Sequence, residues 1–185
     1  LAGEMIQKQQ LSPAAEFQLD CDWTVSTKQN YFLLIKEVKR LMHADHISFT
    51  DSALLSATIR LHQVKYRSKS GIPEVDKGLL MCYNMGNLKN PATKNSILDT
   101  EELKKYLSGL DTYPLLLDIA LPLFNWNVYF SKNTYKGIIN TVSTDELTAA
   151  AGYWKNNLFT FSKDTVLKNI PFQKNDQLRL EESSQ

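Results

Sequence analysis

The sequence predicts an α/β fold in which mostly parallel strands alternate with helices. Apolar runs of strand length recur between amphipathic segments, an alternation typical of strand–helix–strand units. Several runs, such as residues 115–124, are apolar at nearly every position, which indicates strands buried on both faces. About five strands are recognisable, whereas a closed eight-strand barrel needs roughly 250 residues. We therefore expect residues 1–185 to form a single domain, either an open sheet or the C-terminal portion of a (β/α)8 TIM-type barrel.

The first residues of the chain also suggest that it is only part of a barrel. The chain starts at Leu1 with a polar helical segment, residues 1–10, and not with an initiator methionine and a signal peptide. We therefore expect that the preceding part of a longer protein is missing, and with it the N-terminal strands of the barrel. That missing part would be a partner of the strands present in this chain.

The N-terminal half is expected to begin with a strand and a long helix. The strand covers residues 16–23. Apolar residues at helical spacing then predict a helix over residues 26–44, with Ser26 or Thr27 at its N-cap. Two further strands are expected over residues 53–66 and 78–85.

The C-terminal half is expected to be less regular. A short helix over residues 100–110 has Asp99 or Thr100 as its cap and glutamates in its first turn. A strand over residues 113–124 follows, and residues 125–130 extend or follow it. The remaining candidates are a strand at 134–140, a helix at 143–154, and short strands at 158–162 and 177–182.

Composition and charge argue against two classes of protein. Hydrophobic residues make up 43% of the chain and charged residues 22%, ordinary values for a soluble globular protein. The net charge is +1 and the basic residues are scattered, which argues against a nucleic-acid partner because phosphate binding requires a concentrated basic face. No apolar run reaches the length of a membrane span.

The sequence predicts no cofactor and no metal site. Cys21 and Cys82 each lie inside an apolar run without metal-ligand spacing, so both are expected to be small buried residues. His43, Asp45 and His46 lie at a helix end and do not form a convincing ligand set. Glycine-rich nucleotide loops, the GxSxG elbow of serine hydrolases and the HExxH zinc motif are all missing from the sequence.

Two aspartates interrupt the first apolar strand near its C-terminal end. Asp20 and Asp22 share one face of an extended strand with Gln18 and Thr24, because alternate residues point the same way. Neighbours in that row lie ~6.6 Å apart along the strand, within the range of the carboxyl pairs of glycosidases. The pair is therefore predicted to be catalytic, because crowded carboxylates raise the pKa of one of them, which could then stay protonated as a general acid. The structural alternative is that both cap a loop or pair with a basic residue.

The second predicted strand ends with a similar polar row. Arg60 is expected to pair with Asp20 or Asp22, or to bind a substrate hydroxyl or carboxylate. His62, two residues further along the same face, is expected to bind a sugar hydroxyl or to shuttle a proton. A structural salt bridge between adjacent strands is an equally good interpretation of Arg60.

Further polar and aromatic residues follow the third and fourth strands. Tyr83 and Asn84 come at the end of the third strand and are expected to position substrate. Asp118 lies within the fourth apolar run, where substrate binding and an ion pair, for example with Arg60, are both open. Trp23 and Trp126 are expected to stack on sugar rings at the rim, although aromatic residues are also ordinary core material.

These strands resemble a little-characterised bacterial family of (β/α)8 glycosidase-like barrels. The likeness runs from about Glu16 to Ile139 and rests on "QLDCDW", "SATIRLHQ", "LLMCYNMG" and "LLLDIALPLFNW". More distantly, the order is similar to chitinase-type glycoside hydrolases of family eighteen, which carry a DxxDxDxE strand and then a Met-x-Tyr strand. Asp20 and Asp22 match the DxD part of the first motif, and Met81 and Tyr83 match the second.

The resemblance implies a carbohydrate-active protein of the bacterial cell envelope or periplasm, with an oligo- or polysaccharide as its partner. Thr24 occupies the position of the chitinase catalytic glutamate, so that acid is not carried over. Either Asp22 takes the acid role, with Asp20 tuning its pKa or acting as the second carboxylate, or the barrel binds glycans without cleaving them. Three functions are therefore open: a glycoside hydrolase-like enzyme, a non-catalytic glycan-binding or scaffold barrel, and an α/β domain whose polar strand ends form structural ion pairs.

Overall fold

The computed structural model describes residues 2–183, which divide into two compact units. The first unit comprises the chain up to Met81 together with Lys104–Ala120. The second unit comprises Cys82–Leu103 and the residues from Leu121 onward. Compact units can fold separately or as parts of one domain, so the single domain expected over residues 1–185 stays a prediction.

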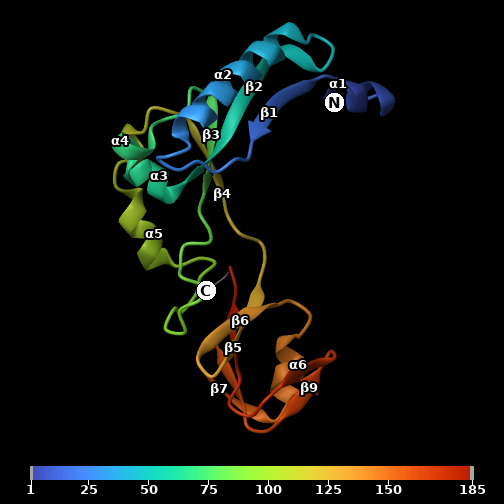
Figure 1. Ribbon diagram of the computed structural model, residues 1–185, viewed down its shortest axis with the longest axis vertical. Helices are drawn as coiled ribbons and strands as arrows, with labels where there is room; N and C mark the ends of the chain where they lie inside the picture. The colour runs from blue at the N-terminus through green and yellow to red at the C-terminus, as the bar shows by residue number, and fades with distance from the viewer. Residues whose placement is uncertain (1, 184–185) are drawn as a thin grey trace. The chain divides into compact units, whose positions relative to one another are not determined.

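The first unit contains a parallel four-stranded sheet in the order β1-β2-β3-β4, which Figure 1 shows together with its helices. Sequential order and parallel direction require a crossover connection between successive strands. The strands are β1 (Ala14–Leu19), β2 (Phe49–Arg60), β3 (Lys77–Met81) and β4 (Leu117–Ala120). The helical segments are α1 (Ala2–Lys8), α2 (Lys28–Ala44), α3 (Leu61–Lys65), α4 (Arg67–Ser70), α5 (Thr100–Leu107), which crosses the boundary between the units in sequence, and the 3-10 turn η1 (Leu110–Thr112).

The long helix α2 forms where the apolar spacing predicts it and lies along β2 (Figure 1). Thr27 is its N-cap residue, as expected, but its hydroxyl makes no capping bond to the helix and instead accepts from the backbone N–H of Thr24 at 2.9 Å. Tyr31, Ile35 and Met42 are the buried residues of the helix. The predicted cap of α5 is confirmed, because Asp99 Oδ1 accepts from the backbone N–H of Glu101 at 2.9 Å.

The two faces of the parallel sheet differ, contrary to the expectation of strands that are apolar on both faces. Leu55, Ala57, Ile59 and Leu80 are 1% exposed or less and share the apolar face through the register that aligns Ile59 with Leu80. Alternate residues point to the opposite face, which is polar. That second face carries Glu16, Gln18, Ser56, Thr58, Arg60, Lys77 and Asp118.

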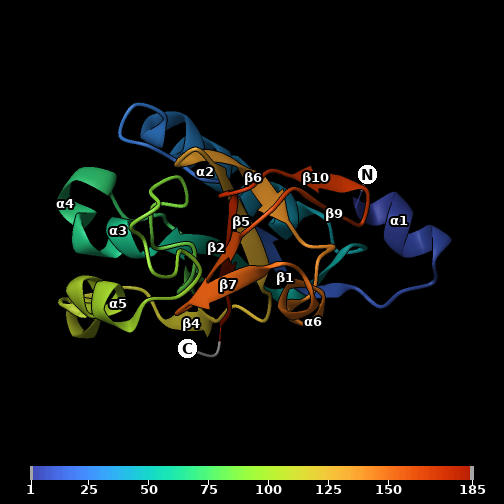
Figure 2. The ribbon, with the colours of Figure 1, turned by 90° about the horizontal axis from the view of Figure 1, so that it is seen from below.

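The second unit is antiparallel, so the mostly parallel arrangement predicted for the whole chain holds only for the first unit. Its five-stranded sheet has the order β6-β5-β11-β8-β7, and β9 and β10 form a separate hairpin (Figure 2). The bounds are β5 (Trp126–Ser131), β6 (Thr134–Ile139), α6 (Thr144–Ala149), β7 (Gly152–Lys155), β8 (Leu158–Phe161), β9 (Thr165–Leu167), β10 (Ile170–Phe172) and β11 (Gln177–Glu181).

Short turns explain this antiparallel arrangement. Parallel neighbours need a crossover of about a dozen residues, whereas antiparallel neighbours need as few as two. Lys132 and Asn133 join β5 to β6 with φ of 51° and 59°, and Lys168 and Asn169 join β9 to β10 with φ of 50° and 63°. Two successive residues with positive φ are typical of hairpin turns that match the twist of the strands.

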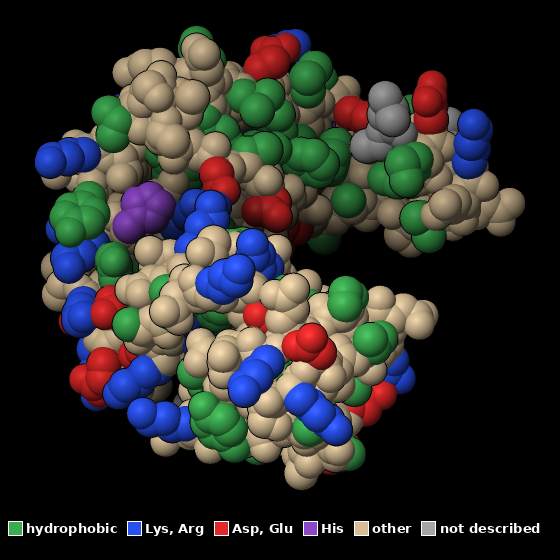
Figure 3. All heavy atoms as spheres, turned by 60° about the horizontal axis from the view of Figure 1, so that its bottom comes forward, with side chains coloured by type: hydrophobic (Ala, Val, Ile, Leu, Met, Phe, Trp, Pro, Cys, Tyr) green, Lys and Arg blue, Asp and Glu red, His purple; other side chains and the backbone are tan. Residues whose placement is uncertain are grey.

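Charged side chains of both signs are mixed on the face of the protein that Figure 3 shows, and neither basic nor acidic side chains gather there by sign. Among residues 2–183 no helix is long and apolar enough to cross a membrane.

The core of the second unit depends on a close contact at Gly152. Phe159, Phe161 and Phe172 are each 1% exposed or less, and the rings of Phe161 and Phe172 stack with centroids 4.5 Å apart. A Cβ atom on Gly152 would lie 2.3 Å from Cζ of Phe159 and 2.5 Å from the carbonyl oxygen of Thr160. Only glycine therefore fits at the start of β7 without moving the phenylalanine.

Replacing Gly152 with Ala is expected to lower the free energy of unfolding by roughly 1–3 kcal/mol, the usual cost of forcing extra volume into a packed core. Chemical denaturation followed by tryptophan fluorescence measures the change. Lys155→Ala, an exposed position on the same strand, is the control and should leave the denaturation midpoint unchanged. Equal stability of Gly152→Ala and wild type would contradict the contact with Phe159.

Candidate functional site

The candidate site is a polar row at the carboxyl ends of β1 and β2. The hydroxyl of Thr58 donates to Oδ1 of Asp20 at 2.9 Å. One residue pair further on, Nη2 of Arg60 donates to Oδ2 of Asp22 in an ion pair. Both aspartates are exposed, so the two carboxyl groups reach solvent.

The register of the sheet produces this row. The structure pairs Leu19, the last residue of β1, with Ala57 of β2. One step further along parallel strands, Asp20 comes opposite Thr58, and Asp22 reaches Arg60 where β2 ends. The predicted strand over residues 16–23 would have contained both aspartates. In the structure β1 ends at Leu19, so both aspartates follow the strand.

A second ion cluster lies on the same face and includes Asp118. Nζ of Lys77 lies 2.9 Å from Oε2 of Glu16 and 2.8 Å from Oδ2 of Asp118. Hydrogen bonds from Ser56 and then from Lys77 lower the pKa of Glu16, and the two carboxylates, Asp118 first, raise the pKa of Lys77. The ion pair foreseen for Asp118 therefore exists, but its partner is Lys77 and not Arg60.

His62 lies in a helix and not on a strand. The predicted strand at 53–66 ends at Arg60, because Leu61 begins α3 and the backbone N–H of Arg60 donates to Oε1 of Gln63 at 2.8 Å. Burial lowers the pKa of the His62 imidazole, the charge of Arg60 lowers it further, and Asp22 partly opposes both. His62 is therefore within electrostatic range of the Arg60–Asp22 pair.

This arrangement predicts opposite pKa changes in two variants. Arg60→Met should raise the pKa of His62 towards its ordinary value of 6.5, whereas Asp22→Asn should lower it further. Since the folded pKa lies below the unfolded one, the neutral imidazole contributes stability that is present above about pH 6.5 and lost as the pH falls through the folded value. NMR titration of the imidazole signals measures the shifts, and changes of the same sign in both variants would contradict the arrangement.

Trp23 is a core residue in this structure and not a platform at the rim. It is 3% exposed, its indole N–H donates to the carbonyl of Ser70 at 2.8 Å, and its ring stacks on Tyr31 at 4.8 Å. Burial, aided by the charges of Cys21, Asp20 and Asp22, raises the pKa of Tyr31 to about 12. Trp23 thus packs beneath the segment that carries the aspartates and offers no open face for stacking on a sugar.

Thr24, the residue at the position of the chitinase glutamate, belongs to a turn. Its hydroxyl lies 2.8 Å from Oγ of Ser26 and 3.2 Å from Oγ1 of Thr27. These contacts connect the end of the β1 segment to the start of α2. Thr24 supplies no carboxyl group, and its hydroxyl is already engaged in the turn.

The remaining predicted site residues belong to the second unit and are described within it. Tyr83 makes an edge contact with Phe124 at 6.2 Å, and Phe124 lies 5.0 Å from the ring of Trp126. Asn84 is exposed and has a left-handed backbone with φ of 54°. Both Tyr83 and Asn84 follow β3, which ends at Met81, so the predicted strand at 78–85 is shorter than expected.

A buried ion pair in the second unit was not predicted. Arg179 and Glu181 are 2% and 0% exposed, and Nε of Arg179 lies 2.6 Å from Oε1 of Glu181. Oε2 of Glu181 accepts from the indole N–H of Trp126 at 2.7 Å and from the hydroxyl of Ser96. The indole edge of Trp126 is therefore held by this network. The charged residues at alternate positions of "QLRLEE" were the available signal in the sequence.

The part of the chain that the structure describes contains no group of three His, Cys, Asp or Glu side chains able to hold a metal ion. Cys82 is buried as expected, and burial raises the pKa of its thiol, whereas Cys21 is exposed.

Comparison with known proteins gives matches only among solved structures. No protein-family model and no curated protein matches the sequence. The fold is similar to a chitinase from Chromobacterium violaceum (TM-score 0.55, 12% identity) and to a Bacillus subtilis protein described as a sporulation-specific glycosylase (TM-score 0.53, 9% identity). It is also similar to the spore cortex-lytic enzyme SleL of Bacillus cereus (TM-score 0.51, 14% identity). The chain shares their fold.

The matches cover nearly all of this chain but only part of each neighbour. They extend over 98%, 98% and 96% of the chain for the chitinase, the B. subtilis protein and SleL. The chain spans 56%, 60% and 40% of the respective neighbours. At 9–14% identity the similarity concerns the fold, a distant likeness to glycosidase-like structures.

Proposed function

We propose that this chain belongs to a glycoside hydrolase-like protein and that Asp20 and Asp22 form its carboxylate pair. The observation that carries the proposal is the placement of two solvent-reaching carboxyl groups directly after β1, beside hydrogen-bonding residues at the end of β2. The carboxyl ends of parallel strands are where α/β enzymes bind and transform ligands. A carboxyl pair is the equipment that glycoside hydrolysis requires.

The hydrogen bonds of the site suggest a role for each residue in hydrolysis. One carboxyl must protonate the leaving oxygen while the other acts as nucleophile or as base towards water. Thr58 donates to one carboxyl oxygen of Asp20, and Arg60 donates to one carboxyl oxygen of Asp22. Each hydrogen bond fixes the orientation of the carboxyl group and leaves its second oxygen for the substrate. Asp22 remains the proposed acid, and to act as one it must release Arg60, take up a proton from solvent and donate it to the leaving oxygen of the substrate. Arg60 and His62 are the proposed binding groups for sugar hydroxyls in this unit.

We further propose that the four parallel strands are a later portion of a (β/α)8 barrel. Their sequential order fits a barrel, because an open doubly wound sheet reverses order at its switch point. The polar face then corresponds to the barrel interior and the apolar face to the helix layer. Asp118 in the first unit, and separately Tyr83, Asn84 and Trp126 in the second, are additional proposed substrate-binding residues.

A non-catalytic glycan-binding protein is the second candidate, and Thr24 favours it. The glutamate of the chitinase-type motif is replaced by a hydroxyl that is bound within a turn. A barrel that retained its binding residues and lost its acid would bind glycans without cleaving them.

A glycan panel tests the first proposal. Chitin oligosaccharides and isolated spore cortex are the first substrates, chosen from what the names of the structural neighbours say, with maltooligosaccharides as the unrelated control. The proposal predicts release of new reducing ends from a member of the first group. Absence of release from every glycan, by a folded protein that still binds one of them, would favour the second candidate.

A further inference from the structure

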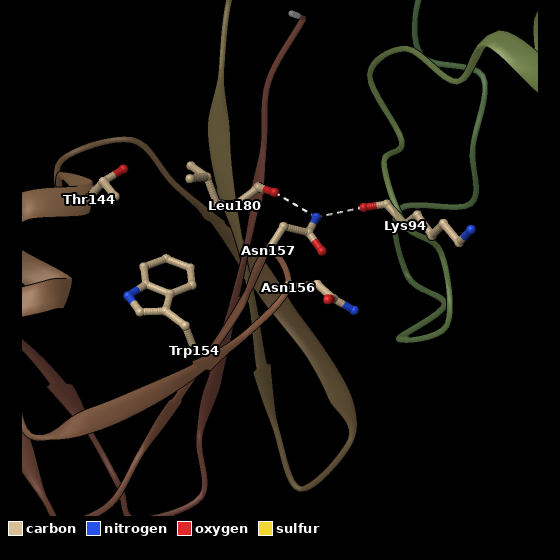
Figure 4. Close-up of a pocket in the computed structure, with 6 residues that line it drawn as sticks. All are labelled: Lys94, Thr144, Trp154, Asn156, Asn157 and Leu180. Carbon is tan, nitrogen blue, oxygen red and sulfur yellow. Dashed lines mark hydrogen bonds between the residues drawn. The ribbon is translucent and has the colours of Figure 1, made fainter. Parts of the chain in front are cut away.

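We infer that the second unit contains a separate glycan-binding pocket next to the turn between β7 and β8. The cavity has a volume of about 690 Å³ and is shown in Figure 4. It is of the size that small ligands occupy, roughly 300–1,000 Å³. Its lining residues are Lys94, Thr144, Trp154, Asn156, Asn157 and Leu180, all within the second unit. Binding here does not depend on the hydrolytic function proposed for Asp20 and Asp22.

Trp154 supplies the aromatic wall of the pocket. Its indole packs at an edge angle of 62° against Phe159, with centroids 5.2 Å apart, so the core supports the ring from one side. In Figure 4 the indole lies on one side of Asn157 and Leu180, and Asn156 and Lys94 lie on the other side of these two residues. A supported aromatic ring beside an open cavity suits the apolar C–H face of a sugar.

A hydrogen-bonded framework holds the opposite wall. Nδ2 of Asn157 donates to the carbonyl oxygens of Lys94 and Leu180, both at 2.8 Å. The backbone N–H of Leu180 in turn donates to the carbonyl oxygen of Asn157 at 2.8 Å. These bonds join three segments that are distant in sequence, so the pocket is already formed before a ligand binds. Preorganisation of this kind reduces the entropic cost of binding.

The polar groups of the pocket match neutral hydroxyl-rich ligands. Asn156 is exposed beside the turn and offers an amide that both donates and accepts, as sugar hydroxyls do. The hydroxyl of Thr144 is a further group for sugar hydroxyls. Lys94 is the single charged residue among the six that line the cavity, whereas phosphate-rich ligands select clusters of basic residues.

The test is NMR titration of the full chain with chitotetraose, observing the tryptophan indole N–H signals. The sequence has three tryptophans, so each signal can be assigned by its loss in a Trp→Phe variant. The Asp22→Asn variant is titrated in parallel, so that hydrolysis does not consume the ligand. We expect a saturable shift of the Trp154 signal in both proteins, while the signal of buried Trp23 stays in place.

Two variants complete the test. Asn156→Gly removes the amide at a position whose φ of 55° glycine accepts, and should weaken binding roughly threefold to tenfold. Trp154→Ala should weaken it roughly tenfold or more, with circular dichroism confirming the fold. A Trp154 signal that does not move, or unchanged affinity in folded Asn156→Gly and Trp154→Ala proteins, would overturn the pocket. If the chain binds chitotetraose at Trp154 but hydrolyses no glycan, the proposed pocket stands and the proposed hydrolase function is wrong.

Discussion

Replacing Asp22 with Asn should reduce the rate of glycan hydrolysis by roughly 10²–10⁴-fold, the usual contribution of a general acid or base. Asparagine keeps the size of the side chain and an oxygen that accepts from Arg60, but it cannot transfer a proton. Asp20→Asn should have an effect of the same order, because hydrolysis needs both carboxyl groups. Both side chains are exposed, so neither variant should lose stability.

Asp51→Asn is the matched control for this prediction. It makes the same chemical change at an exposed aspartate whose neighbour is His46, 3.3 Å away, and it should leave hydrolysis unchanged. Steady-state kinetics on the glycan that wild type cleaves fastest provides kcat and KM separately. Losses confined to KM in both Asp20→Asn and Asp22→Asn would assign the aspartates to binding rather than to proton transfer.

Replacing Arg179 with Met should lower the free energy of unfolding by roughly 3–5 kcal/mol. The substitution leaves Glu181, which is 0% exposed, as a buried carboxylate without its cation. It also removes the donors to the carbonyl oxygens of Asn90 and Leu88, at 2.8 and 3.1 Å, which connect β11 to the segment after β3. The second unit should therefore lose the anchorage of that segment.

Two comparisons isolate the buried charge. Arg40→Ala breaks an exposed ion pair with Glu37 and should cause no measurable change in stability. Arg179→Met combined with Glu181→Leu removes both charges and should recover part of the lost stability, because no charge is then left unpaired. Denaturation monitored by fluorescence and by circular dichroism measures all three proteins. A loss in Arg179→Met no larger than in Arg40→Ala would contradict the importance of the pair.

The parallel sheet was predictable because long apolar runs and helical spacing are local signals. Tyr31 and Ile35 repeat at helical spacing and are buried in α2. The row of Asp20 and Asp22 followed from the two-residue period of a strand, and their contacts with Thr58 and Arg60 follow from the parallel register.

Other features depend on particular side-chain contacts that apolar spacing does not reveal, and they were missed. Leu61 begins a helix because the side chain of Gln63 binds the backbone of Arg60, so His62 leaves the strand face. The partner of Asp118 is decided by which basic side chain on the same face of the sheet reaches it, and that is Lys77, two residues before Leu79, which is aligned with Asp118. The pairing of Arg179 with Glu181 required the unpredicted antiparallel sheet, in which β11 is an inner strand.

The most direct measurement of the central proposal compares cleavage and binding of one glycan by three proteins. Wild type, Asp20→Asn and Asp22→Asn are each assayed for release of reducing ends and, by calorimetry, for affinity. We predict that wild type cleaves the glycan and that both variants bind it without cleaving it. If all three proteins bind the glycan equally and none cleaves it, Asp20 and Asp22 are not the carboxylate pair of a hydrolase.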